Sequence, residues 1–490
     1  MSVRTAWSFC CISMKTTQRR LSVTLSVFYS KLIRGDMVTT TIRALFTDPQ
    51  GVPTRVAPAM MVLPAAAGRG CLFALFALFV AVLWLPLRPA SADVAAGDLV
   101  DKDNIEEAIE FLHPGLEWCV RRGLVMEIVE TGNNSYPAVY DKATEKYQAQ
   151  VEMAADGRTL INYVAGQPFP LLDPNDPEIA RKIMWNYYYN PFLTDDFTIK
   201  YFDADTGPIT PRGMVIERHF VIEQLRRLMY NGRVHVDPKP EFLPNLEKYR
   251  HQESLHPIIE PFDLKGIGSS TARYMNPDRS DDTWLYIPQL RRVRRLSSAQ
   301  RSDALFGQDI DMDSYGGYSG NPAWFDWRFL GEKTILGAVH GKRWPAHWCE
   351  GGGDFVFCDT WEKRDVWVIE GRAHMPTYAY GKRVLFVDKF AFYTPSTDIY
   401  DRGLQLWKIW INGINVGRRP FPEAKVSVYD YDTGFIPNIT MVDMQLEHAT
   451  RAALPSHQFP EEEGWYWNMG PKVGLHPDFF TVAELIRTGR

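Results

Sequence analysis

The sequence predicts a mainly β protein of the α+β class, built on one large curved antiparallel sheet. Three observations indicate this class. Helical periodicity is confined to the region before about residue 200. After Met214 the chain changes to short apolar segments bounded by Gly, Pro, Asn and Asp, a pattern typical of strands. Several of these segments are apolar on both faces, as expected for a sheet that curls around a filled interior.

Two helices are expected in region 93–200. Asp103 and Glu106 have the spacing of a capping box, and His113–Gly115 contains a proline expected to end the first helix. Its apolar face would consist of Ile105, Ile109 and Leu112. The second helix is expected from near Pro177. Its apolar residues would be Ile179, Ile183 and Met184.

Region 201–490 is expected to form an open antiparallel barrel in one domain with those helices. Short links between sequential strands favour an antiparallel meander over crossover units. Thr394–Gly403 is expected as the long turn of a hairpin. The predicted strands are Met214–Ile222, Thr283–Ile287, Trp324–Leu330, Val366–Glu370, Arg383–Tyr393, Leu404–Ile411, Val426–Tyr431 and Thr440–Leu446.

The first 92 residues are expected to direct export. Arg69 precedes an apolar run, Cys71–Leu85, of about 15 residues, which is shorter than the roughly 20 that cross a bilayer as a helix. Ala90–Ala92 then has the small-x-small pattern of a signal peptidase site. We therefore predict a cleaved signal peptide over 60–92 and a periplasmic protein, with an uncleaved anchor as the alternative. Residues 1–59 are expected to be a non-native or disordered extension.

The charge of the chain argues against nucleic acid as a partner. The formal net charge is −5, and residues 1–92 hold about ten basic and two acidic side chains, so residues 93–490 carry about −13. A nucleic-acid-binding protein needs a basic face, which so acidic a chain does not favour.

The cysteines indicate an oxidising compartment. Cys349 and Cys358 flank a short glycine-rich loop and are expected to form a disulfide. The alternative is zinc, with His340 and His347 as further ligands, but no Cys-x-x-Cys knuckle is present. Cys119 is expected to be a buried small apolar residue.

Several long segments of the chain are distinctive. They are Glu253–Pro257, Pro261–Gly266, Asp282–Pro288, Arg291–Arg295, Trp327–Gly331, Tyr380–Arg383 and Asp398–Leu406. These segments resemble a family of exported bacterial proteins known as domain-of-unknown-function family 1329. An amino-terminal Thr-Pro-x-Gly-Ala-Glu stretch seen in many relatives is not evident, and Asp101–Gly123 occupies its place, which indicates a divergent branch.

This family is similar to the outer-membrane lipoprotein-sorting carriers. The resemblance implies their fold, an incomplete antiparallel β-barrel wrapped around helical plug segments, with a concavity for acyl chains or other hydrophobic ligands. It also implies two partners, a resistance-nodulation-division-type inner-membrane exporter and an outer-membrane protein.

Large apolar residues on the predicted strands are the candidates for lining such a cavity. They are Trp284, Tyr286, Trp324, Trp327, Trp367, Phe386, Trp407 and Ile409. The alternative is an ordinary protein core on both faces of the sheet, since buried aromatic residues are common.

Two charged motifs have alternative interpretations. Arg291, Arg292, Arg294 and Arg295 are candidates for gripping an anionic head group, although solvent-facing arginines paired with acidic residues are the preferred interpretation. Asp309, Asp311 and Asp313 begin like a calcium loop, but Ser314 and Gly320 stand where a glycine and a glutamate are expected. Loop capping or pairing with nearby arginines is therefore favoured.

No catalytic motif is present. The chain lacks a Gly-x-Ser-x-Gly elbow and a His-Glu-x-x-His helix. We predict a non-catalytic periplasmic carrier or chaperone for a hydrophobic or lipid-like molecule, without cofactor or metal. The alternative is an accessory protein that docks to an exporter or outer-membrane protein. A third hypothesis is a hydrolase of amphipathic substrates using residues such as His340 and His347.

Overall fold

The computed structural model describes residues 93–490 except 134, 457, 460, 474 and 490, together with the backbone of four earlier strands. The chain divides into two units, Met1–Ser91 and Ala92–Arg490. In the first unit β1 (Met14–Gln18), β2 (Leu21–Arg34), β3 (Met37–Thr47) and β4 (Pro53–Pro64) form an antiparallel sheet. The predicted signal segment Cys71–Leu85 and the cleavage pattern Ala90–Ala92 lie outside the described residues. Within the described part, no helix has the length and apolar character needed to span a bilayer.

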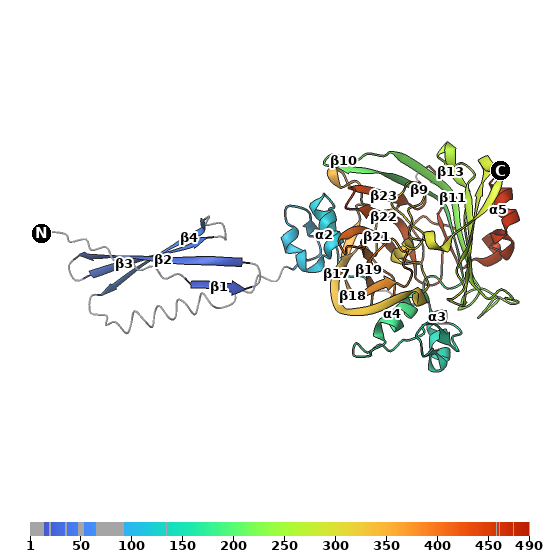
Figure 1. Ribbon diagram of the computed structural model, residues 1–490, viewed down its shortest axis with the longest axis horizontal. Coiled ribbons are helices and arrows are strands. Elements are labelled where there is room, and N and C mark those ends of the chain that lie inside the picture. Colours follow the sequence, from blue (N-terminus) through green and yellow to red (C-terminus); the bar gives the residue numbers. More distant parts are fainter. Residues whose placement is uncertain are drawn as a thin grey trace. The chain divides into compact units, whose positions relative to one another are not determined.

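The second unit contains few helices and many strands (Figure 1). The helices are α2 (Pro114–Arg121), α3 (Ala138–Tyr147), α4 (Ile179–Tyr188) and α5 (Val482–Thr488). The strands are β5 (Leu99–Val100), β6 (Met126–Ile128), β7 (Glu152–Met153), β8 (Leu160–Ile161), β9 (Asp196–Thr210), β10 (Gly213–Met214), β11 (Arg218–Met229), β12 (Tyr249–Leu255), β13 (Ile258–Glu260), β14 (Gly268–Tyr274), β15 (Asp282–Ile287), β16 (Arg292–Leu296), β17 (Phe325–Gly337), β18 (Thr360–Ala373), β19 (Lys382–Asp388), β20 (Ser396–Tyr400), β21 (Leu406–Gly417), β22 (Thr433–Asp443), β23 (His448–Ala453) and β24 (Trp465–Trp467).

One long antiparallel sheet organises this unit. From edge to edge its strands run β16-β15-β14-β12-β11-β9-β23-β22-β21-β20-β19-β18-β17. Strand β9 joins two halves, because it pairs with β11 on one side and with β23 and β24 on the other. No backbone ladder among the described residues joins β16 to β17, so the barrel is incomplete and has an open seam. The predicted fold class is confirmed, with one parallel pair, β6 and β18, added to the antiparallel sheet.

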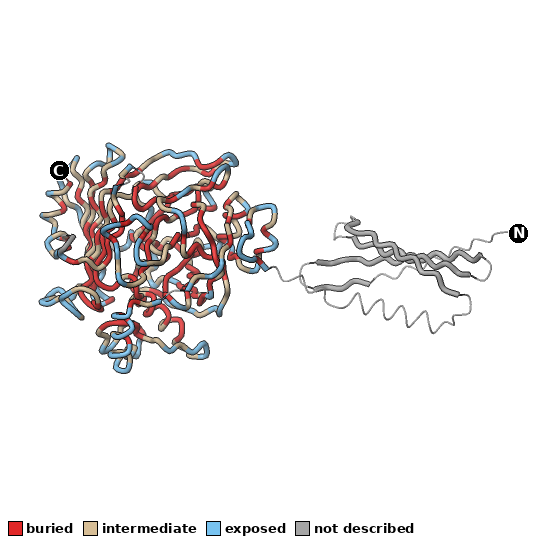
Figure 2. The backbone as a smooth tube through the Cα atoms, turned by 180° about the vertical axis from the view of Figure 1, so that it is seen from behind, coloured by how far each residue is buried: buried red, intermediate tan, exposed pale blue. Residues whose placement is uncertain are grey.

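Protein packs against both faces of most of the half-sheet from β17 to β23, termed the second half-sheet, and part of the inner face of β21 to β23 faces the cavity described below. Ile409 belongs to one core cluster with Leu116 and Cys119 of α2. Its neighbour Trp410 points to the opposite face and packs in another cluster with Ile183 of α4. Buried residues therefore run along these strands, while exposed residues gather on the loops (Figure 2). Outside the part that faces the cavity, apolar residues on both faces of these strands form ordinary two-sided core.

The first predicted helix is wrong in its extent. Residues 105–111 form two 3-10 turns, η1 (Ile105–Glu107) and η2 (Ile109–Phe111), and Asp103 caps neither of them. Pro114 begins α2 at its first helical position, where a missing N–H costs nothing. The second predicted helix is confirmed as α4. Its predicted apolar residues Ile179, Ile183 and Met184 are all buried.

Two strand predictions also need correction. The predicted turn Thr394–Gly403 contains β20, which pairs with both β19 and β21, so no hairpin joins those two strands directly. Segment Val426–Tyr431 is a loop. The Glu463 carboxylate accepts hydrogen bonds from the amides of Lys425, Val426 and Ser427, and it thereby replaces the partners that a strand ladder would provide.

The C-terminal helix α5 covers the outer face of β14 and β15 (Figure 1). His256 is buried beneath this segment, and its Nδ1 lies 3.1 Å from Thr488 Oγ1. Burial and then the charge of Arg226 lower the pKa of His256 to about 4. Because the histidine binds a proton more readily when the chain is unfolded, stability is lost as pH falls from about 6.5 toward 4.

We expect His256→Gln to remove about 2.5 kcal/mol of the difference in unfolding free energy between pH 7.5 and 4.5. Urea unfolding at both pH values measures this difference. His347→Gln is the matched control, because His347 is exposed. An unchanged pH dependence in His256→Gln would contradict the assignment.

Candidate ligand cavity

A cavity of about 550 Å³ lies on the concave side of the sheet. Its walls come from the first half-sheet (β9, β11, β12, β14, β15 and β16), the inner face of β21 to β24, the end of α4 and segment 297–320. This volume lies within the range of roughly 300–1,000 Å³ that holds one small ligand. The open seam between β16 and β17 is spanned by chain that includes segment 297–320.

Strand register gives the wall of the first half-sheet a graded polarity. Side chains paired across neighbouring strands point to the same face, so each set of partners forms a row. One row is mainly apolar and consists of Ile199, Leu225, Leu255, Ser269 and Leu285. The next row is mixed and consists of Phe197, Arg227, Glu253, Thr271 and Thr283. The third row consists of Met229, His251 and Arg273. All of these residues line the cavity.

The opposite wall adds large apolar side chains. Those from β21 to β24 and their links are Trp410, Ile414, Ile436, Ile439, Leu454, Trp465 and Trp467. Among the lining residues, the exposed ones all come from one segment. They are Ser297, Gln300, Asp303 and Ala304. The cavity therefore reaches the surface beside the open seam of the barrel.

Ion pairs compensate most of the charges at the polar end. Arg227 Nε donates to Glu253 Oε2 at 2.7 Å across β11 and β12. Arg273 lies 2.7 Å from Asp281, which also pairs with Arg301 at 3.4 Å. The two arginines lower the pKa of Asp281 against the effect of its burial, so this carboxylate is ionised.

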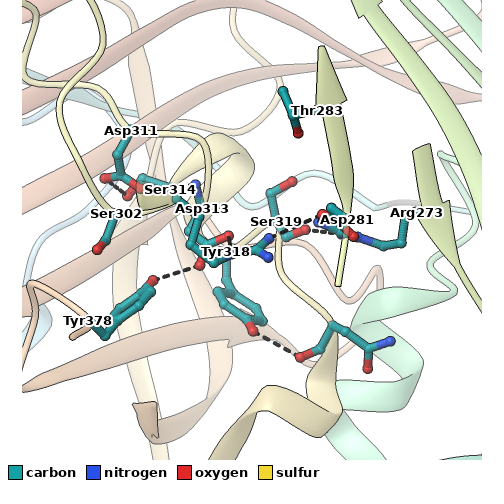
Figure 3. A network of polar contacts seen from close by, with 12 residues as sticks. Arg273, Asp281, Thr283, Ser302, Asp311, Asp313, Ser314, Tyr318, Ser319 and Tyr378 are labelled. Atoms are coloured by element: carbon teal, nitrogen blue, oxygen red, sulfur yellow. Dashed lines mark hydrogen bonds and ion pairs between the residues drawn. The ribbon is translucent and has the colours of Figure 1, made fainter. Parts of the chain in front are cut away.

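A buried polar network continues behind this wall (Figure 3). Asp313 accepts from Arg301 Nε at 2.6 Å and from Tyr378 Oη at 2.9 Å. Asp311 accepts from Tyr380 Oη at 2.6 Å and lies 3.6 Å from Arg383. The network fastens segment 301–319 to β14, β19 and the link before β15.

Asp309, Asp311 and Asp313 were expected to start a calcium loop, to cap a loop or to pair with nearby arginines. Two of the three pair with an arginine. Asp311 and Asp313 pair with Arg383 and Arg301 instead of the neighbouring run Arg291–Arg295. Asp309 points elsewhere and pairs with His448 at 2.8 Å. Within the described residues, no group of three or more His, Cys, Asp or Glu side chains is arranged to hold a metal ion.

The eight residues predicted to line a cavity lie outside its wall. Trp284 and Tyr286 alternate with the lining residues Thr283 and Leu285, so they point to the outer face of β15. The other six belong to packed core or to the ends of the second half-sheet. They are Trp324, Trp327, Trp367, Phe386, Trp407 and Ile409.

The four predicted head-group arginines are exposed at the edge of the sheet. Arg291 precedes β16 in a left-handed backbone conformation, while Arg292, Arg294 and Arg295 lie on the strand. Arg295 forms an ion pair with Asp282. None of the four lines the cavity. Charged side chains on an edge strand oppose pairing with another chain, which gives this run a physical role.

The predicted disulfide Cys349–Cys358 is present, which leaves neither sulfur available to ligate zinc. The bonded segment carries Phe355 and Phe357 into the core beneath α2. Cys119 is a free buried cysteine in the same cluster, as predicted. The histidines weighed as zinc ligands or catalytic residues do not line the cavity: His340 pairs with Glu362 at 3.0 Å, and His347 is exposed.

One buried cluster has the order of a hydrolase triad. Ser396 Oγ lies 2.6 Å from His113 Nε2, and His113 Nδ1 lies 2.9 Å from Asp398 Oδ1. All three residues are at most 1% exposed, and none lines the cavity. Asp398 also accepts from the Gly115 amide at 3.3 Å, so the cluster joins the start of α2 to β20.

Sequence reasoning missed the residues that do line the cavity. Strands β12 and β14 are rich in polar residues and give no apolar alternation, so neither was predicted. Their alternate side chains, such as His251, Glu253, Thr271 and Arg273, acquire meaning only once the register pairs them. The sequence offered only a weak signal for these two strands, because polar residues occupy both sets of alternate positions.

Comparisons with known proteins give the following similarities. A domain assigned to outer membrane lipoprotein sorting from Vibrio parahaemolyticus is 16% identical, with a TM-score of 0.40 over 60% of this chain and 92% of that one. A DUF1329 family protein from Desulfovibrio piger is 14% identical, with a TM-score of 0.39 over 60% and 92%. A LolA superfamily protein from Nitrosomonas europaea is 14% identical, with a TM-score of 0.35 over 62% and 98%.

No curated protein matches the chain significantly. The family model described as "Protein of unknown function (DUF1329)" matches residues 99–485. This match confirms the resemblance seen in the sequence segments. Because it covers most of the chain, the protein belongs to the DUF1329 family.

Proposed function

We propose that the protein is a carrier for a hydrophobic molecule, which it holds between the first half-sheet and the inner face of β21 to β24. The observation that carries this proposal is the cavity of about 550 Å³ with a largely apolar wall. The concave sides of the two half-sheets differ in what lies against them. Helix α4 and segment 310–325 fill the concave side of the second half-sheet, whereas the space against the first half-sheet stays open to a ligand.

The position of the cavity mouth supports exchange of the ligand. The exposed lining residues lie in segment 297–304, beside the seam where no strand pairing closes the barrel. A ligand can therefore enter without breaking a backbone ladder among the described strands. This arrangement suits a carrier, which must both load and release its cargo.

We place this function in the cell envelope. The Cys349–Cys358 disulfide supports an oxidising compartment such as the periplasm. The apolar run Cys71–Leu85 supports export by an N-terminal signal. The inner-membrane exporter and the outer-membrane protein implied by the family resemblance stay predictions. Affinity co-purification from host membranes would test whether either protein binds this chain.

Filling part of the cavity is expected to weaken the binding of apolar ligands. Ala452 on β23 pairs with Ala204 on β9 and lines the cavity where the two half-sheets meet. We expect Ala452→Phe to weaken binding of the neutral dye N-phenylnaphthylamine and of dodecanol at least about tenfold, because the new ring occupies ligand volume. Fluorescence titration measures dye binding, and displacement measures dodecanol binding.

The matched control is Leu446→Phe, which adds a ring at a position that is 73% exposed in the same β22–β23 hairpin. It should leave both affinities unchanged, and circular dichroism should show that both variants are folded. If the wild type binds neither probe, or if Ala452→Phe binds them as tightly as wild type, the carrier proposal fails.

A further inference from the structure

The polar end of the cavity contains a buried arginine without a carboxylate partner. Arg250 is 3% exposed and lines the cavity. Its Nη1 donates to Met229 Sδ at 3.1 Å and lies 3.5 Å from the Asn231 carbonyl oxygen, and its Nε has no hydrogen-bond partner. Among the described residues, no carboxylate lies within ion-pair distance of this guanidinium.

A β-bulge brings Arg250 to the cavity. The register between β12 and β14 shifts between Tyr249 and His251, so the regular alternation of side chains is interrupted there. Arg250 and His251 are consecutive, yet both line the cavity. Bulges commonly re-aim a side chain in this way, at a cost to the strand ladder.

The surroundings of Arg250 are aromatic and cationic. Its guanidinium lies 5.1 Å from the ring centre of Tyr188 and 4.6 Å from that of Tyr189. Burial, followed by the charges of Arg227, Arg273 and Arg250, holds the pKa of His251 well below its usual value. The neutral histidine therefore adds no charge, and Arg250 leaves this end of the cavity with one positive charge that no carboxylate among the described residues balances.

The other lining arginines are already compensated. Arg227 pairs with Glu253, Arg273 pairs with Asp281, and Arg301 pairs with both Asp281 and Asp313. The remaining lining carboxylate, Asp303, is exposed in the segment at the mouth. One negative charge on a ligand would complete the ion pairing of the polar end, while its apolar part contacts the row that ends at Leu285.

We infer that the cargo is an anionic amphiphile, with a carboxylate or phosphate head group bound at Arg250 and an apolar chain lying along the first half-sheet. This inference rests on the proposed carrier function and names the class of its ligand. A buried arginine is suited to the task because its guanidinium stays charged and forms strong charge-assisted hydrogen bonds with such groups.

The test compares ligands that differ only in the head group. With the purified full chain at pH 7.5, we expect dodecanoate and dodecyl phosphate to displace N-phenylnaphthylamine at least about tenfold more tightly than dodecanol or methyl dodecanoate. This comparison uses wild-type protein alone, so it does not depend on the folding of any variant. The ratio of dodecanoate to dodecyl phosphate affinities distinguishes the two head groups.

Variants then assign the preference to Arg250. Arg250→Gln should reduce the preference for dodecanoate over dodecanol to within about twofold, and Arg250→Lys should keep part of the preference. The matched control is Arg295→Gln, which removes an arginine that pairs with Asp282 outside the cavity wall and should keep the preference. Equal wild-type affinity for acid and alcohol, or a preference unaffected by Arg250→Gln, overturns the inference but leaves the carrier function intact. Binding of neither ligand overturns the carrier function itself.

Discussion

Replacing Arg383 with methionine is expected to lower the free energy of unfolding by about 3–5 kcal/mol. Arg383 on β19 is fully buried. Its guanidinium donates to Ser314 Oγ at 3.0 Å and to Tyr378 Oη at 2.9 Å, and it lies 3.6 Å from Asp311. Without it, Asp311 is a buried carboxylate that has lost its cationic partner. Urea unfolding at pH 7.5 measures the change.

Two further variants separate this effect from general damage. Arg295→Gln removes an exposed arginine that also pairs with an aspartate, and it should cost less than about 1 kcal/mol. The double variant Arg383→Met/Asp311→Asn should lose less unfolding free energy than the two single variants lose together, because no uncompensated charge remains. A cost below about 1 kcal/mol for Arg383→Met would show that the network contributes little to stability.

This network also fixes the geometry of the cavity. Asp281 and Asp313 both form ion pairs with Arg301, and Arg301 lines the cavity. The segment that follows contributes Tyr315, Tyr318 and Ser319 to the same wall. Loss of the network is therefore expected to loosen the polar end that faces Arg250.

The sequence predicted the class of fold well because the relevant signals are local. Short apolar segments with turn residues between them indicate strands, and the segments around Val366 and Val384 are apolar on both faces. That two-sided pattern correctly indicated a sheet covered on both sides. It could not distinguish a wall packed against the protein's own α2 and α4 from a wall facing a cavity, since both require apolar residues.

The candidate site was harder to predict because its determinants are non-local. The cavity rows depend on the register of five strands, and a shift by one residue would exchange Thr283 and Leu285 for Trp284 and Tyr286. The arginine partner of Asp311 is Arg383, far along the chain, whereas sequence proximity favoured Arg291–Arg295. Arg250 lines the cavity only because of a bulge, which no pattern in the segment indicated.

Removing the Cys349–Cys358 disulfide is expected to cost about 2.5 kcal/mol of unfolding free energy. The bond closes a loop with a sequence separation of 9, and loop-closure entropy gives about this value. The loop also matters for packing, because Phe355 and Phe357 are completely buried within it and backbone hydrogen bonds join its two ends, Cys349 N to Val356 O at 3.0 Å and Cys358 N to His347 O at 2.7 Å. The double variant Cys349→Ser/Cys358→Ser should therefore unfold at lower urea concentration.

Reductant supplies the internal control for this variant. In a chain that begins at Asp93, wild-type protein in reductant should approach the stability of Cys349→Ser/Cys358→Ser. The variant should not respond to reductant, because Cys119, its remaining cysteine, is buried and unbonded. A variant as stable as wild type would show that the buried ring contacts of the loop suffice without the bond.

Because the loop packs beneath α2 and away from the cavity wall, dodecanol affinity should be unchanged in variant molecules that remain folded. Stability and ligand binding are thus expected to separate, since the disulfide lies beneath α2 and the proposed ligand site lies on the first half-sheet.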